Sequence, residues 1–116
     1  MKIKPHDENH IVDVYAVYWA KKEGINQRFY LIIPYKGYEG FNACSELESD
    51  LIDPSLSDFI LKKDDYGGDL LIHYAAHKDN LIYDLIDHDP EAMAKFLDLL
   101  EKEGKTQHFP PYPASE

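Results

Sequence analysis

Two runs of β-branched and aromatic residues lie close together near the start of the chain and limit the folds open to it. They are "HIVDVYAVYWA" (10–20) and "RFYLIIPY" (28–35), separated by the polar, glycine-containing "KKEGINQ". Such side chains suit a pleated sheet, and two runs joined by a short turn are typical of an antiparallel hairpin. The second strand is expected to end near Ile33, because Pro34 cannot donate a ladder hydrogen bond.

The first run is apolar at nearly every position. Strict alternation divides it into two faces, which are Val12, Val14, Ala16 and Tyr18 on one side and Ile11, Tyr15, Val17 and Trp19 on the other. A strand that is apolar on both faces is covered on both faces. We therefore expect it to lie inside the sheet rather than at an edge.

Further strands are predicted downstream. The weakly alternating "FNACSELES" (41–49) predicts a third strand. "SDFILKK" (57–63) and "LLIHYAA" (70–76) flank the turn "DDYGGD" and predict a second hairpin. The alternative is a helix that begins after Asp69, with Asp69 as its N-cap.

The end of the chain predicts two helices. Asp89 is a good N-cap and Pro90 suits the first helical position, and the apolar residues that follow at helical spacing are Met93, Phe96, Leu97 and Leu100. Upstream, "DNLIYDLIDH" (79–88) predicts a shorter amphipathic helix. The predicted fold class is α+β: an antiparallel sheet built from hairpins, with about four to five strands, followed by two C-terminal helices. Residues 1–104 form one domain, and the proline-rich 105–116 form an extended or disordered tail.

Charge and cysteine content exclude several classes of function. The 116 residues carry a formal charge of −10, which repels phosphate backbones and argues against a nucleic-acid ligand. Cys44 is the only cysteine, so no internal disulfide is possible. No apolar stretch approaches the roughly 20 residues of a membrane helix, and the first residues lack the apolar run of a secretory signal. We expect a cytoplasmic protein that does not bind membranes.

Two residue patterns suggest enzyme chemistry. His73 and His77 have the spacing that zinc proteases use on a helix, but Tyr74 occupies the position of their catalytic glutamate. Cys44 with a histidine would make a nucleophile and a base. A small metal-dependent enzyme that uses His73 and His77 therefore stays open as an alternative. The expectation is a non-enzyme without a cofactor or metal.

The stretch "GGDLLIHYAAHKDNL" (67–81) resembles a single ankyrin repeat. The matching residues are Ile72, His73, Ala75 and Ala76, with Leu81 opening the second helix of the repeat. The resemblance implies that these residues are helical. Leu70 and Leu71 stand where the repeat has Thr-Pro, and one repeat cannot bury its own apolar face.

Tyrosines beside carboxylates predict a surface that binds a basic protein, because Tyr supplies rigid contact area and acids pair with Lys or Arg. The predicted binding residues are Asp64, Asp65, Tyr66 and Asp69 in the second turn, Glu46, Glu48 and Asp50 on one face of the third strand, and Tyr38.

A small, acidic, single-domain α+β chain without a catalytic set resembles the immunity proteins of bacterial toxin systems, including those of contact-dependent growth inhibition. This resemblance implies an inhibitor that binds a basic toxin domain, such as a nuclease, and blocks its active site or substrate surface. The other alternative is a regulatory or scaffold domain that binds a partner through its apolar helix or its tail. The sequence does not determine the oligomeric state.

Overall fold

The computed structural model describes residues 1–35, 37–38, 40–63 and 68–102, so the predicted tail at 105–116 lies outside it. The strands are β1 (Lys2–Pro5), β2 (Val12–Lys22), β3 (Ile25–Ile32), β4 (Asn42–Ser45), β5 (Ser49–Asp53), β6 (Phe59–Lys63) and β7 (Asp69–His73). The helices are α1 (Tyr74–His77), α2 (Ile82–Ile86) and α3 (Pro90–Lys102), with 3₁₀ turns η1 (Glu46–Glu48) and η2 (Lys78–Asn80). The predicted α+β class is confirmed, but the described residues form seven strands rather than four to five, and three α-helices rather than two.

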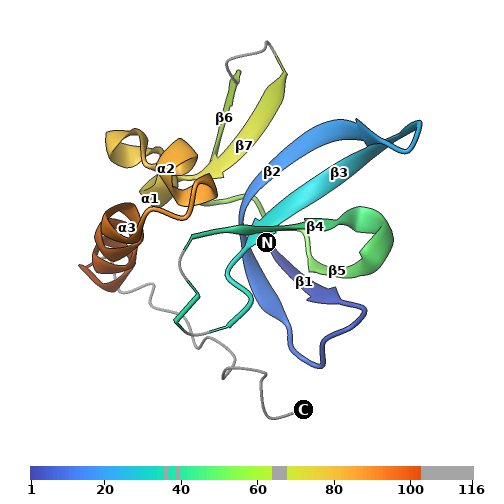
Figure 1. Ribbon diagram of the computed structural model, residues 1–116, viewed down its shortest axis with the longest axis horizontal. Coiled ribbons are helices and arrows are strands. Elements are labelled where there is room, and N and C mark those ends of the chain that lie inside the picture. The colour runs from blue at the N-terminus through green and yellow to red at the C-terminus, as the bar shows by residue number, and fades with distance from the viewer. Residues whose placement is uncertain (36, 39, 64–67, 103–116) are drawn as a thin grey trace.

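The long strand β2 organises the sheet, as its apolar composition predicts. One path of neighbouring strands runs β4-β3-β2-β1-β5, and β7 pairs with β2 and carries β6 on its other side (Figure 1). The start of β2 pairs with β1, with Val12 opposite Ile3, and a later part pairs with β7, with Tyr18 opposite Leu70. All these pairs are antiparallel, and the β2–β3 and β6–β7 hairpins are the two that the sequence predicts.

A β-bulge interrupts β2 at Tyr15. Val14 lies opposite Ile32 of β3, whereas Ala16 lies opposite the next residue, Leu31, so β2 contains one extra residue here. An extra residue reverses which side chains point to each face. The predicted strict alternation is therefore wrong beyond Val14.

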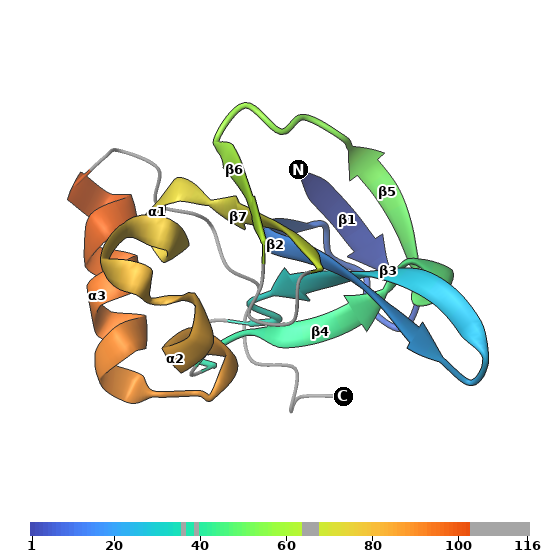
Figure 2. The ribbon, with the colours of Figure 1, turned by 90° about the horizontal axis from the view of Figure 1, so that it is seen from above.

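The reversal lets β2 contribute to two cores on opposite faces of the sheet. The first core lies between the sheet and the helices. Within it, Tyr15 of β2 stacks on Phe41 of the loop after β3 and meets Phe96 of α3 edge to face. The second core contains Ile3, Val12, Val14, Val17, Tyr30 and Ile32. Figure 2 shows the helices on one side of β2 and β7, with β1 and β5 on the other.

The predicted third strand at 41–49 is wrong as a single element. Its first residues form β4, but Ser45 then accepts a hydrogen bond from the backbone N–H of Leu47 at 3.1 Å and caps η1. The chain re-enters the sheet as β5 at the far end of the strand path. A serine that caps a turn competes with continued strand pairing, and β1, which pairs with β5, was not predicted.

The C-terminal helix forms as its sequence predicts. Asp89 Oδ1 accepts the N–H of Glu91 at 3.2 Å, Pro90 is the first helical residue, and Met93, Phe96 and Leu100 are buried against the first core. The shorter helix is present as α2. Within the described residues, no helix is both long enough and apolar enough to cross a membrane.

The stretch that resembles an ankyrin repeat is a strand followed by a short helix. Ile72 lies in β7, opposite Ala16 of β2 and Ile60 of β6, so the helical prediction at Ile72 and His73 is wrong. Asp69 begins β7 and does not cap a helix. The strand ends at His73, whose Nδ1 accepts the N–H of Ala75 and caps α1, so the predicted strand is too long at its end.

Gly40 is a site where backbone geometry requires glycine. Its φ is +97°, and an added Cβ would lie 2.5 Å from the carbonyl oxygen of Leu85 and 2.8 Å from Cα of His88. This close approach lets the next residue, Phe41, donate its N–H to the Leu85 oxygen at 3.0 Å. Gly37 has a similar φ of +92°, but no atom lies within 4 Å of an added Cβ.

We predict that Gly40→Ala destabilises the fold by about 2 kcal/mol more than Gly37→Ala. Both variants carry the strain of a positive φ, about 1 kcal/mol, but only the first pushes the loop away from α2. Urea unfolding of the two variants and the parent measures the difference. An equal decrease in the free energy of unfolding for the two variants would show that the loop does not pack tightly on α2.

Candidate functional site

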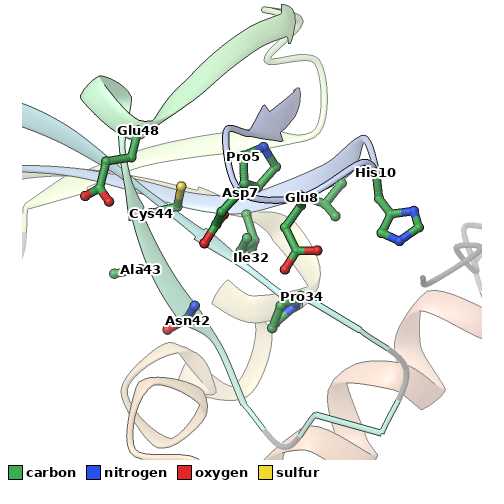
Figure 3. Close-up of a pocket in the computed structure, with 11 residues that line it drawn as sticks. Pro5, Asp7, Glu8, His10, Ile32, Pro34, Asn42, Ala43, Cys44 and Glu48 are labelled. Atoms are coloured by element: carbon green, nitrogen blue, oxygen red, sulfur yellow. The ribbon is translucent and has the colours of Figure 1, made fainter. Parts of the chain in front are cut away.

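A cavity of about 240 Å³ opens where the second core meets the surface (Figure 3). Its walls come from the β1–β2 connection, the start of β2, the end of β3, strand β4 and η1. The lining residues are Pro5, Asp7, Glu8, His10, Val12, Ile32, Pro34, Asn42, Ala43, Cys44 and Glu48. We call this cavity the acidic hollow.

Backbone hydrogen bonds hold the two acidic walls of the hollow together. The N–H of His6 donates to the carbonyl oxygen of Glu48 at 2.9 Å, which extends the β1–β5 pairing by one step. The N–H of Glu8 then donates to the oxygen of Pro5 at 3.1 Å and turns the chain back toward β2. The acids of the β1–β2 connection are thereby placed beside η1, although they lie far apart in the sequence.

The floor of the hollow is apolar. Val12 and Ile32 are buried members of the second core, and Pro34 and Ala43 continue the apolar lining toward the rim. An aliphatic chain placed here would be removed from water, which stabilises it by about 25 cal/mol for each Å² of apolar surface covered. The hollow thus combines an apolar base with a charged rim.

Three carboxylates lie around this floor without a basic partner. Asp7 and Glu8 come from the β1–β2 connection and Glu48 from η1 (Figure 3). No Lys or Arg lines the hollow, and within the described residues none of the three carboxylates forms an ion pair. Their negative charges therefore add, and the site favours a cation.

Cys44 lies on β4 within the hollow, and its surroundings make it a poor nucleophile. Burial raises the pKa of the thiol, and the negative charges of Glu48 and Asp7 raise it further, while a hydrogen bond with Ser49 lowers it. Because the thiolate is the reactive form, a raised pKa leaves the thiol protonated near neutral pH. The surroundings of the thiol therefore favour a protonated wall residue over a catalytic nucleophile.

The structure separates the acidic residues predicted on the third strand. Glu48 lines the hollow, whereas Glu46 accepts the backbone N–H of Arg28 and lies 3.7 Å from its guanidinium. Asp50 follows in β5 with an exposed carboxylate 3.2 Å from Nε2 of His6. The three acids do not share one strand face, because η1 intervenes between β4 and β5.

The other predicted binding residues do not line the hollow. Tyr38 packs edge to face against Tyr35 and His88, beside α2, and Asp69 binds Lys63 at 2.6 Å at the start of β7. Asp64, Asp65 and Tyr66 lie outside the described residues. The structure thus brings one predicted residue, Glu48, into the hollow.

Sequence reasoning missed Asp7, Glu8 and His10, which stand in "HDENH" just before the first apolar run. The available signal was a pair of acids in a loop next to a predicted strand. That signal is weak, since surface loops are commonly acidic. Only the unpredicted pairing of β1 with β5 places these acids beside Glu48.

His73 lines a second cavity, of about 270 Å³. His73 is buried and its Nδ1 accepts a backbone N–H, while His77 is exposed on α1. The carboxylate of Asp13, which also lines this cavity, binds Lys2 at 2.7 Å. Within the described part of the chain, no group of three or more His, Cys, Asp or Glu residues is placed to hold a metal ion.

No family model, curated protein or solved structure matches this chain. Candidate ligands for the acidic hollow therefore follow from its own charge and shape. A cationic head group on an aliphatic stem, as in Lys or Arg, satisfies both the rim and the floor.

We predict that Asp7→Asn combined with Glu48→Gln speeds alkylation of Cys44 by iodoacetamide at pH 8. Removing two negative charges lowers the thiol pKa and increases the thiolate fraction, although burial still limits the rate. The rate is measured by mass spectrometry on the folded protein. Asp84→Asn combined with Glu101→Gln makes the same charge change on exposed helical positions and should leave the rate unchanged; equal rates in all three proteins would contradict the electrostatic coupling.

Proposed function

We propose that this protein is a non-enzymatic binding protein, an immunity protein that neutralises a basic toxin domain by direct contact. The acidic hollow receives a Lys or Arg side chain of that domain. The observation that supports this most is a group of three carboxylates around an apolar floor, Asp7, Glu8 and Glu48, none of which forms an ion pair with another described residue.

The chemistry of the hollow suits an arginine in particular. A guanidinium donates in a planar fork that matches a carboxylate, and several carboxylates around one opening can accept its remaining N–H groups. The methylene stem of the arginine would cover Val12, Ile32 and Ala43. Asp7 and Glu48 are exposed and Glu8 is half-buried in the free protein, so charged hydrogen bonds to an arginine here gain strength only as the bound partner excludes water.

Occupation of the hollow explains how binding would inhibit a nuclease. Such a toxin uses Lys and Arg to hold the phosphates of its substrate. Carboxylates on a rigid rim present negative oxygens to the same cations. A toxin residue bound by Asp7, Glu8 and Glu48 is therefore no longer available to nucleic acid.

The charge of the whole molecule assists the encounter. The formal charge of −10 attracts a basic partner over distances of about 10 Å at ordinary ionic strength. Asp50 adds an exposed carboxylate next to the hollow, whereas Glu46 contributes less because Arg28 already balances it. Association is therefore expected to slow with added salt.

The test begins with a search beside this gene for a reading frame that encodes a secreted protein with a basic C-terminal domain, and that domain is then the binding partner to be assayed. We predict that Asp7→Asn, Glu8→Gln and Glu48→Gln together weaken its binding by about tenfold to a hundredfold, because the bound cation loses its carboxylate partners. Isothermal titration calorimetry at two salt concentrations measures the affinity, and growth after co-expression measures protection.

Two further variants make the result specific. Asp84→Asn, Asp87→Asn and Glu101→Gln remove the same charge from exposed positions in α2, in the turn after it and in α3, and should reduce affinity far less. Charge reversal of Asp64 and Asp65 tests the turn that the sequence singles out. If the hollow variant melts, binds and protects like the parent, the hollow is not the toxin site; if no neighbouring basic domain binds the parent, the immunity assignment is wrong.

A further inference from the structure

Strand β6 is an edge of the sheet with a regular backbone. Among the described residues it pairs only with β7, and the register from Phe59 opposite His73 to Lys63 opposite Asp69 has no break. Figure 1 shows β6 on the side of β7 away from β2. An unbroken edge strand is a template for another strand.

The alternation of hydrogen-bonded pairs between β6 and β7 identifies which backbone groups of β6 face outward. Tyr74 donates its N–H to the oxygen of Asp58 at 3.0 Å, one step beyond the end of the β6–β7 pairing. Bonded pairs alternate along an antiparallel ladder, so Ile60 and Lys62 bond to β7. Leu61 and Lys63 therefore present both their N–H and C=O groups at the open edge.

The side chains at this edge are also unusual for an unpaired strand. Ile60 and Leu61 are 37% and 64% exposed, and they lie on opposite faces of the same short strand. Natural edge strands commonly carry lysines that discourage pairing. Here the Lys62 ammonium lies 5.7 Å from the centre of the Tyr83 ring, and Lys63 forms an exposed ion pair with Asp69, which offsets its charge.

The other two edges are less suited to strand addition. The register of β5 shifts between its pairings with Lys2 and Ile3, and Asp50 and Asp53 place carboxylates along it. A bulge and charges are both devices that protect an edge. Strand β4 lines the acidic hollow and passes directly into η1.

We propose that β6 is a docking strand for an extended peptide segment with alternating apolar and basic residues. Backbone bonds to Leu61 and Lys63 supply the affinity, and the apolar residues of the segment, which all lie on one of its faces, cover Leu61. The formal charge of −10 favours a basic segment. The same charge disfavours a second copy of this chain. A strand of five residues also buries far less surface than the roughly 1,200 Å² that a stable protein pair buries. This site is separate from the acidic hollow, and binding at β6 does not depend on the proposed function.

The probes are two capped peptides of about seven residues, one alternating valine and lysine and the other alternating valine and glutamate. Hydrogen exchange by NMR follows the amides of Leu61 and Lys63 during titration of the full chain. We expect the valine–lysine peptide to slow exchange at these amides. Leu61→Pro, which removes an outward donor that the β7 pairing does not use, should weaken binding by about tenfold.

Matched variants separate this site from the hollow and from misfolding. The Asp7→Asn, Glu8→Gln and Glu48→Gln protein should bind the probe at β6 like the parent. If Leu61→Pro fails to fold, Leu61→Lys keeps the backbone donor and adds a charge that repels the basic probe, so it too should bind more weakly. Unchanged exchange at Leu61, or equal protection by the valine–glutamate peptide, would overturn the proposal. Self-association that Leu61→Pro abolishes would also overturn it, because the occupant would then be a second copy.

Discussion

The β-bulge at Tyr15 determines which side chains of β2 enter each core. Before the bulge Val12 and Val14 face the second core, and after it Val17 does, while Tyr15 and Ala16 face the helices. A bulge also increases the local bend and twist of a strand. The start of β2 can then pair with β1 while its later part pairs with β7, so one strand supports two branches of the sheet.

The acidic hollow follows from this branching. Because β1 and β5 lie over the second core, the end of that core is closed by the β1–β2 connection, β4 and η1, and Val12 and Ile32 remain as a floor. In the proposed complex, a cation of the partner is attracted by the carboxylates around that floor, while its aliphatic stem covers the apolar side chains.

The three sheet edges differ in ways that matter for recognition. Strand β5 is interrupted and acidic, β4 is a wall of the hollow, and β6 is regular with exposed apolar side chains. In the two proposed binding modes, the hollow recognises a side chain by its charge, whereas the β6 edge recognises backbone and depends less on which residues the peptide carries. Surfaces of such different chemistry would engage separate parts of a basic partner.

Local features of the sequence determined the elements whose signals lie within a few residues. The β2–β3 and β6–β7 hairpins, the end of β3 before Pro34 and the capped helix at Asp89 all follow from neighbouring residues, because turns, proline and N-caps act over short distances. The sequence also set the negative charge of the molecule, which does not depend on the fold.

Tertiary structure alone decided the bulge at Tyr15, the division of 41–49 into β4, η1 and β5, and the pairing of β1 with β5. These features depend on contacts between distant segments, and a bulge changes which residues are buried without changing any local preference. Of the predicted binding residues, Glu48 lines the acidic hollow, while Asp7 and Glu8 are its neighbours only through the fold. A cluster of charges assembled from distant segments has no local signature, because each acid by itself is an ordinary surface residue.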